Sequence, residues 1–423
     1  MSRFRRRLMG LSALRQAMKD DFVRVEYIEN TSTAYIDTGI IANQNTNYEI
    51  KVQFTKSTGY PYIFGAQQAN RDRRFSLMEG SWNAFYYGAN LHTQEINLSL
   101  TTEQQTSNLV VKKDGLNMYV DGEQKGTFSN ATFTTPSTLT IFTCHYANGQ
   151  VHNNVYKGRL YYFKIYDGTT LVRDFIPMYQ KSKDLYGLWD RVEEKFYTSP
   201  NGVKFTGGER VIADANDNLY YLKDYVVARG YYSFADTGIK GNSNDLLKMS
   251  LMVTSRPPTS YCWLIGYSYS ETNRFGIYWR NSGTGYKWCV DFWRGGGYSN
   301  RRASTIYPNL NQRYDLIVGN PSTTQNNLSY MEDIRTNTVI FPEAEINPIG
   351  SSMSYVVSEN RGSKANYYVR WYNLEIYKTM SGKKELVLHW IPVQRCSDGV
   401  WGFFDKVKED FHSSEGTEEF TGA

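Results

Sequence analysis

Aromatic and arginine side chains gather in two short stretches, and this combination could bind carbohydrate. Flat aromatic rings can stack on sugar faces, and a neighbouring arginine can donate hydrogen bonds to hydroxyl groups. The stretches span residues 279–294 and 82–87. Because alternate residues of a strand face opposite sides of a sheet, some of these rings are expected to line a core instead. The candidate contact residues are Trp279, Arg280, Trp288, Trp293, Arg294, Trp82 and Tyr86.

Acidic residues decide whether the chain carries a glycosidase site, because glycoside hydrolysis ordinarily uses a pair of carboxylates. The spacing Glu-x-Asp-x-x-Glu, which would place such carboxylates along one strand, does not occur. The adjacent pairs Glu193–Glu194 and Glu418–Glu419 fall where solvated turns are expected. We therefore predict no catalytic residues and no enzymatic activity.

Histidine, cysteine and acidic residues show no spacing typical of a metal site. The five histidines and four cysteines form no zinc pattern. We predict no metal site and no cofactor; calcium is left open, because oxygen donors are present without the spacing of a calcium loop. The donors are Asp37, Asn70, Asp72, Asp236 and Asn273. The cysteines fit buried small residues, with a Cys262–Cys289 bridge as the alternative.

The composition of the chain favours β-strands joined by turns. Of the 423 residues, 15% are aromatic, and there are 34 glycines and 11 prolines. Residues 48–54 alternate Tyr, Ile, Val and Phe with polar residues, which is the pattern of a half-buried strand. Residues 108–122 contain two Asp-Gly pairs beside apolar runs, which predicts a hairpin.

Charge and hydropathy argue against two classes of partner. The net charge is +5, and part of it comes from four arginines within the first seven residues, so we predict no nucleic-acid binding. The sequence has no apolar run of 18 residues, so we predict no association with a membrane.

An internal repeat predicts two domains. Phe175-Ile176-Pro177, Gly187-Leu188-Trp189-Asp190 and Phe205-Thr206-Gly207 recur 215 residues later as Trp390-Ile391-Pro392, Gly402-Phe403-Phe404-Asp405 and Phe420-Thr421-Gly422. Residues 35–40 recur at 234–239, an offset of 199, so the second copy is longer in its middle. We predict tandem copies of one all-β domain at 23–208 and 220–423, joined by a linker at 209–219.

Residues 1–22 differ in composition from the rest and are predicted to form a short helical or extended arm. Apolar residues fall near helical spacing between arginines and lysines. Arg15 and Gln16 interrupt the apolar run, which argues against a signal peptide. We expect the arm to attach the protein to a partner; a disordered tail is the alternative. The candidate attachment residues are Arg5, Arg6, Arg7, Leu8 and Leu11.

Residues 25–40 carry a resemblance to a known family. They read Val-Glu-Tyr-Ile-Glu-Asn-Thr-Ser-Thr-Ala-Tyr-Ile-Asp-Thr-Gly-Ile. This stretch resembles the opening L-E-Y-I-E-S-T-G-T-Q-Y-I-D-T-G of concanavalin A-like, laminin G-type jelly-roll domains in virion proteins of tailed phages that infect gut bacteria. It departs from that opening at Val25, Asn30, Ser32 and Ala34. Residues 113–122 resemble the family segment K-D-G-x-x-x-Y-V-D-G.

The resemblance implies two tandem concanavalin A-like jelly-roll β-sandwiches behind the arm. It also implies a non-enzymatic virion structural protein, as a fibre, capsid-decoration or tail-associated component assembled in the host cytoplasm. Expected partners are other virion proteins, further copies of the chain as a homo-oligomer, and host surface polysaccharide. The alternative is a secreted or surface lectin-like, carbohydrate-binding protein of a gut bacterium.

Overall fold

The computed structural model describes residues 21–423 with eleven short gaps. The chain forms two compact units, residues 1–211 and 212–423. The predicted arm therefore lies outside the described residues, except for its last two positions. The gaps are 69–70, 81–82, 90–93, 230–232, 256–260, 271–272, 282–284, 295–300, 327, 346–349 and 358–366.

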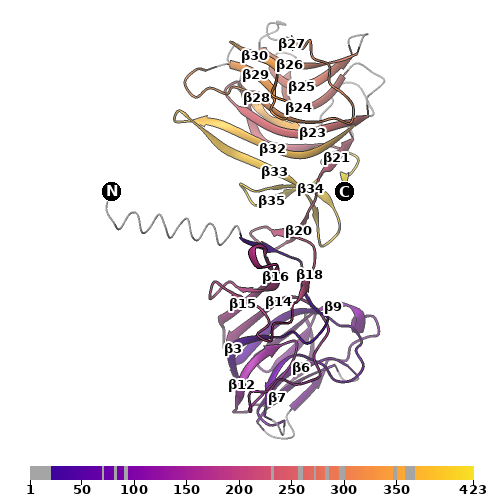
Figure 1. The fold of residues 1–423 in the computed structure, drawn as a ribbon, viewed down its shortest axis with the longest axis vertical. Coiled ribbons are helices and arrows are strands. Elements are labelled where there is room, and N and C mark those ends of the chain that lie inside the picture. Colours follow the sequence, from indigo (N-terminus) through magenta and orange to yellow (C-terminus); the bar gives the residue numbers. More distant parts are fainter. Residues whose placement is uncertain are drawn as a thin grey trace, which may run out of the picture. The chain divides into compact units, whose positions relative to one another are not determined.

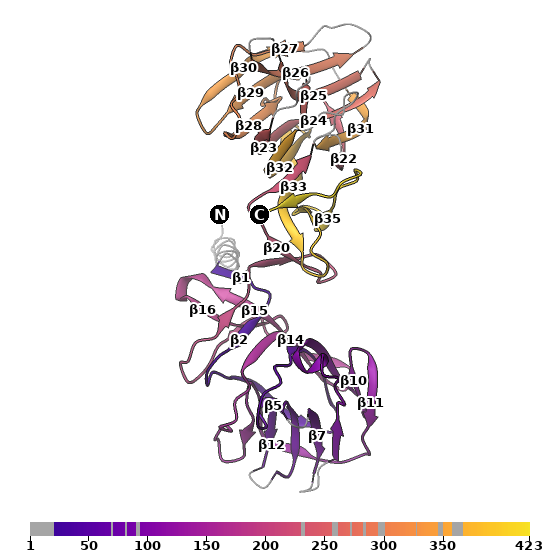
Figure 2. The ribbon, with the colours of Figure 1, turned by 90° about the vertical axis from the view of Figure 1, so that its right-hand side faces the viewer.

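The first unit consists of two sheets that face each other (Figures 1 and 2). Its larger sheet has the order β11 (Glu123–Thr127), β10 (Asn117–Val120), β9 (Asn108–Asp114), β4 (Thr46–Gln53), β14 (Gly158–Asp167), β15 (Thr170–Gln180), β16 (Leu185–Asp190) and β17 (Lys195–Tyr197), and β1 (Phe22–Arg24), β2 (Ile28–Asn30) and β18 (Thr206–Gly207) pair beside this path. Its smaller sheet has the order β3 (Ile36–Asn43), β12 (Thr134–Ile141), β5 (Tyr62–Gln67), β6 (Arg74–Met78), β7 (Ala84–Gly88) and β8 (Gln94–Asn97), with β13 (His145–Tyr146) against β5. Two 3₁₀ turns are η1 (Gln104–Thr106) and η2 (Lys181–Lys183).

The second unit repeats this plan. Its larger sheet has the order β19 (Val211–Ala213), β20 (Leu219–Leu222), β33 (Lys383–Arg395), β32 (Tyr368–Met380), β23 (Leu246–Ser255), β28 (Arg313–Gly319), β29 (Leu328–Asp333) and β30 (Thr338–Glu345), and β21 (Val226–Arg229), β34 (Trp401–Asp405), β35 (Asp410–His412) and β36 (Thr421–Gly422) pair beside this path. Its smaller sheet has the order β22 (Ala235–Asn242), β31 (Gly350–Val357), β24 (Tyr261–Ser270), β25 (Asn273–Asn281), β26 (Tyr286–Arg294) and β27 (Arg301–Ala303).

The strand order establishes that the units are copies of one fold. In the smaller sheets, β3-β12-β5-β6-β7-β8 corresponds to β22-β31-β24-β25-β26-β27. In the larger sheets, β11-β10-β9-β4-β14-β15 corresponds to β30-β29-β28-β23-β32-β33. The predicted fold class, a tandem pair of β-sandwiches, is therefore confirmed. In the described part of the chain, no helix has the length and hydropathy of a membrane span.

Each sandwich has its own apolar core between its two sheets. In the first, the alternating residues Tyr48, Ile50 and Val52 of β4 are all buried, as their spacing predicts. In the second, β23 and β32 supply the corresponding core residues. No disulfide joins any of the four cysteines, all of which the structure describes: Cys262 lies opposite Trp279 and Cys289 opposite Tyr278, so the alternative of a bridge between them does not hold.

The ends of the first domain differ in detail from the predicted boundaries. Phe22, assigned to the arm, packs against the rings of Trp189 and Phe196, each at 5.1 Å between ring centroids. The first residues of the predicted linker at 209–219 are tied to the first unit, because the backbone N–H of Glu26 donates to the carbonyl of Glu209 at 3.0 Å. Strand β19 within that linker belongs to the sheet of the second unit.

Candidate functional site

The two faces of the smaller sheet in the second unit carry different side chains. Along β25, Phe275, Ile277 and Trp279 point into the core. Gly276, Tyr278 and Arg280 alternate with them and therefore lie on the outer face. Of this second set, Tyr278 is buried at 0% exposed and Arg280 is exposed.

This alternation corrects the prediction for two of the candidate tryptophans. Trp279 and Trp288 are 0% exposed. Their rings meet edge to face at 5.3 Å, and both also pack against Tyr314 from the opposite sheet. Neither ring offers a face to a sugar, and we assign both to the core.

The outer face of this sheet presents a different tryptophan, which the sequence did not single out. Trp263 of β24 is half-buried and packs on Tyr278, with ring centroids 4.4 Å apart and planes 33° apart. A Cβ atom on Gly276 would lie 2.0 Å from the Trp263 ring, so glycine at this position lets the ring lie against the sheet. The hydroxyl of Tyr278 donates to Asp291 at 2.9 Å, which fixes the ring beneath the tryptophan.

The same face in the first unit carries Tyr86, as predicted, together with Arg74. The Arg74 guanidinium lies 3.6 Å from the centre of the Tyr86 ring, and it also donates to the hydroxyls of Ser76 at 2.8 Å and Tyr62 at 3.4 Å. Tyr62 in turn packs on His152, with centroids 4.8 Å apart. Tyrosine, arginine and histidine thus form one connected group on this face.

Burial sets the protonation of this group. Desolvation, followed by the charge of Glu95, raises the pKa of Tyr86 to about 12, so its hydroxyl stays protonated and can donate. Desolvation, together with the charges of Arg74 and Arg71, lowers the pKa of His152 below its usual value of 6.5, so its ring is neutral at pH 7. Within this group Arg74 and Tyr62 are buried, whereas the neutral imidazole of His152 and the ring of Tyr86 are half-buried.

The outer faces of the two sandwiches are equivalent in position. Phe64-Gly65 of β5 and Ile265-Gly266 of β24 differ by 201 residues, which aligns Tyr62 with Trp263. In the ladders, Tyr62 lies opposite Met78, and Trp263 lies opposite Tyr278. Both copies thus place an aromatic residue at the same point of the outer face. We refer to these surfaces, built around Tyr62, Arg74 and Tyr86 in the first unit and Trp263 and Tyr278 in the second, as the aromatic faces.

The other predicted contact and attachment residues are placed only in part. Arg280 is exposed at the end of β25, opposite Lys287. The backbone of Trp293 and Arg294 belongs to β26, but their side chains lie outside the described residues. Also outside the described residues are Trp82 and the arm residues Arg5, Arg6, Arg7, Leu8 and Leu11.

Comparisons with known proteins add little to this geometry. No family model and no curated protein matches the chain. Among solved structures, domains LG4-5 of the mouse laminin alpha1 chain are similar over 87% of this chain and 90% of that chain, at 10% sequence identity and a TM-score of 0.28. A likeness of this size carries no argument, so the fold assignment rests on the strand order described above.

Proposed function

We propose that the protein is a non-enzymatic structural component of a phage particle that contacts host surface glycan through its aromatic faces. The fibre, capsid-decoration and tail-associated positions all fit this role, with other virion proteins and further copies of the chain as partners. The virion part of the proposal rests on the resemblance of residues 25–40 to virion jelly rolls. The glycan part rests on the aromatic faces.

The observation that carries the glycan part is the position of Trp263. Its half-buried ring is supported from below by Tyr278 and by the space over Gly276, so little side-chain freedom remains to be lost on binding. An aromatic ring held rigidly in this way suits the apolar side of a sugar ring. The first unit repeats the arrangement with Tyr86 and the stacked guanidinium of Arg74.

We also propose that the protein has no enzymatic activity. A glycosidase needs two carboxylates on either side of the bond it cleaves. Among the described residues, the contacts of Tyr86 include one carboxylate, that of Glu95, and those of Tyr278 include one, that of Asp291. Asp291 is buried and already accepts a hydrogen bond from Tyr278, so it is placed to hold a ring rather than to attack a sugar.

Binding of bacterial polysaccharides to an array tests the aromatic faces. We expect Trp263→Ala to weaken binding by about tenfold or more, because it removes a stacking platform worth about 1.4 kcal/mol or more. Tyr86→Ala tests the first unit in the same way. Tyr368→Ala is the matched control, since Tyr368 is exposed on the larger sheet of the second unit. Unchanged binding in both face variants, with their folds retained, would rule out this surface.

Mass spectrometry of purified particles tests the virion role separately. We expect the intact chain to be found in particles, and to be found there whether or not the aromatic faces are mutated. Recovery of the protein in the bacterial envelope instead would favour the lectin-like alternative.

A further inference from the structure

Asp405, at the end of β34, has a buried carboxylate, and one of its two oxygens accepts no hydrogen bond among the described residues. Its side chain is 0% exposed. Oδ1 accepts the backbone N–H groups of His389 at 3.1 Å and Val407 at 2.9 Å. Oδ2 has no hydrogen-bond partner among the described residues. A buried carboxylate oxygen without a partner is costly, which calls for a further group at this point.

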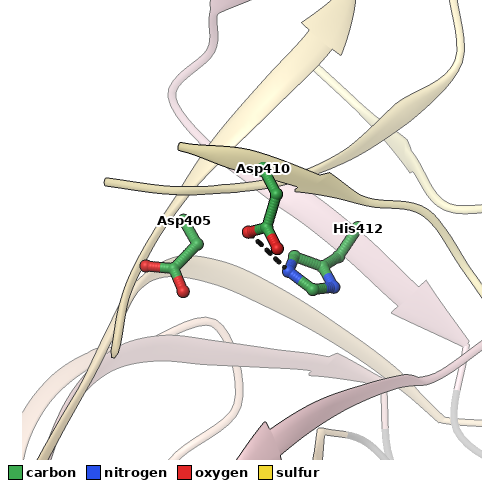
Figure 3. Close-up of side chains that lie close together, drawn as sticks. All are labelled: Asp405, Asp410 and His412. Atoms are coloured by element: carbon green, nitrogen blue, oxygen red, sulfur yellow. Dashed lines mark hydrogen bonds and ion pairs between the residues drawn. The ribbon is translucent and has the colours of Figure 1, made fainter. Parts of the chain in front are cut away.

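Two more metal-binding side chains lie beside this carboxylate (Figure 3). Asp410 is directly opposite Asp405 in the ladder between β34 and β35, and His412 follows on the same face of β35. One carboxylate oxygen of each aspartate and one imidazole nitrogen lie within 4.8 Å of one another. Two carboxylates directly opposite each other repel, so the pair is stabilised if a cation lies between them.

The imidazole of His412 is held in place by its surroundings. Its ring packs on Trp390, with centroids 4.7 Å apart, and its Nε2 lies 3.0 Å from Oδ1 of Asp410. A Cβ atom on Gly402 would lie 2.3 Å from the carbonyl oxygen of His412, so glycine at this position allows β35 to approach β34. The side chains of Asp410 and His412 are 48% and 21% exposed, which leaves the cluster open to solvent on one side.

The first unit shows what normally faces the equivalent carboxylate. Asp190 corresponds to Asp405, and its Oδ1 also accepts two backbone N–H groups. Its Oδ2, like that of Asp405, accepts no hydrogen bond among the described residues, but it forms an ion pair with the Nε of Arg173 at 3.4 Å. In the second unit the position of Arg173 is occupied by Leu388, which is fully buried and carries no charge.

Two further residues near this aspartate also differ in type between the two units, as Arg173 and Leu388 do. The copy-one positions Lys195 and Tyr197 line a pocket of about 460 Å³ that also contains Arg173. At the offset of 215 residues they become Asp410 and His412. The second unit has therefore exchanged a fixed side-chain cation for two further metal-binding groups.

We propose that Asp405, Asp410 and His412 bind a divalent transition-metal cation of the zinc class. An imidazole nitrogen with two carboxylates suits zinc, whereas calcium prefers six to eight oxygen ligands. Zinc bonds to nitrogen and oxygen are about 2.1 Å long, so tetrahedral ligands of one ion lie about 3.4 Å apart, and three donor atoms within 4.8 Å of one another can reach this spacing by small side-chain movements. Water fills the coordination positions on the exposed side. The ion joins β35 to β34 and takes the electrostatic place of Arg173.

A lysine is the rival source of positive charge. Lys408, in the turn between β34 and β35, points its Nζ to within 3.9 Å of where a Cβ on Gly238 would lie. The corresponding atom in the first unit is Nη2 of Arg173, 3.6 Å from the equivalent point at Gly39. Lys408 forms no ion pair with Asp405 within the described residues. Its ammonium could reach the carboxylate only by moving, and the experiment separates this case from the metal.

Calorimetric titration of the untagged full-length protein, after treatment with a chelator, tests the proposal with ZnCl₂. We expect one zinc ion per chain, with weaker binding of Ca²⁺. Asp405→Asn and His412→Gln should each reduce zinc affinity by at least about tenfold. Lys408→Met should leave zinc affinity unchanged or raise it. His145→Gln is the matched control, since His145 lies in the first unit away from any acidic cluster in the described residues.

Several results would overturn the proposal. Zinc binding that survives both Asp405→Asn and His412→Gln would place the ion elsewhere. An absence of zinc binding, accompanied by a loss of stability in Lys408→Met, would assign the cation to the lysine. If Asp405→Asn fails to fold, the more exposed Asp410→Asn and His412→Gln decide, together with the visible absorption of bound Co²⁺, which reports a change of ligand directly.

Discussion

Lys113 is an ammonium group buried in the first sandwich. Its Nζ donates to the carbonyl oxygens of Thr46 at 2.9 Å and Gly115 at 2.6 Å, and to the side chain of Asn47 at 3.1 Å. Desolvation lowers the pKa of Lys113 from 10.5 to about 8. The residue thus joins β9 to β4 at the cost of a buried charge, which makes it a probe of the interior of the sandwich.

The lowered pKa predicts how stability depends on pH. Between pH 8 and 10.5 the unfolded chain binds more protons at this residue than the folded chain, so the free energy of unfolding rises with pH in this window. The gain from pH 8 to 9.5 should be about 1–2 kcal/mol. Well below pH 8 the residue is charged in both states and contributes no slope.

Lys113→Met tests this prediction, because methionine fills the same space without a charge. Urea unfolding of the protein and of the variant at pH 8 and 9.5 gives the two slopes, and contributions shared by both, such as those of tyrosines, cancel. Between pH 8 and 9.5, the free energy of unfolding should rise by about 1–2 kcal/mol more in the unmodified protein than in the variant. Equal slopes would mean that Lys113 is solvated and titrates at its ordinary pKa.

At the scale of the residue, the aromatic stretch 279–294 shows where prediction from sequence ends. The sequence places Trp279 and Trp288 on strands, but it does not say which face of the sheet they occupy. That choice is set by the pairing in the sheet: Trp279 lies opposite the buried Cys262, whereas Trp263 lies opposite Tyr278 on the other face. Trp279 therefore belongs to the buried core set, and the half-buried Trp263 to the outer set.

At the scale of the element, turns with strong local signals were predicted well. Asp114-Gly115 and Asp121-Gly122 do terminate β9 and β10, and Asp121, Gly115 and Gly122 all have positive φ, between 48° and 83°. The segment 209–219 has no such signal. It was predicted as a linker, and its order comes from side-chain hydrogen bonds that composition does not reveal.

Asp214 provides that order. Its Oδ1 accepts the backbone N–H groups of Asn216 at 2.8 Å and Asn218 at 3.0 Å, while its Oδ2 accepts the side-chain amide of Asn218 at 2.8 Å and the hydroxyl of Tyr220 at 2.9 Å. These bonds close the turn between β19 and β20. The carboxylate is the acceptor in all four, so a single substitution removes them together.

Asp214→Ala should therefore turn this segment into a site of proteolysis. With each hydrogen bond contributing about 0.5–1.5 kcal/mol, we expect initial cleavage within 208–220 by proteinase K to be about tenfold faster than in the unmodified protein. Asn216→Ala is the control, because only the backbone N–H of Asn216 takes part in the bonds to Asp214. Equally rapid cleavage of all three proteins would mean that the segment is an open linker.

At the scale of the whole molecule, the repeat was readable because glycines and aromatics at the closing strands recur at a fixed offset. What the repeat did not reveal is where the copies differ in charge. Asp190 and Asp405 align, yet only the structure shows that Arg173 pairs with the first and that Leu388 leaves the second without that partner. A metal site is therefore not predictable from the sequence, because neither copy contains a metal motif within itself.

Two complete cores predict two independent folding units. The main core cluster of the first unit extends from Ile28 to Phe205, and that of the second from Val226 to Phe420, and each unit has a smaller cluster of its own. Because each cluster lies within its own unit, residues 21–210 and 211–423 should each fold alone, with stabilities in the ordinary range of about 5–15 kcal/mol. The cut after residue 210 keeps β19 whole and keeps Arg210 with its bridge partner Val25.

Near-ultraviolet circular dichroism and thermal unfolding of the two fragments test this prediction. Each fragment should unfold in one cooperative transition, and the sum of their near-ultraviolet spectra should match that of the full chain. A fragment that lacks a near-ultraviolet signal or a cooperative transition would show that its core depends on the other copy.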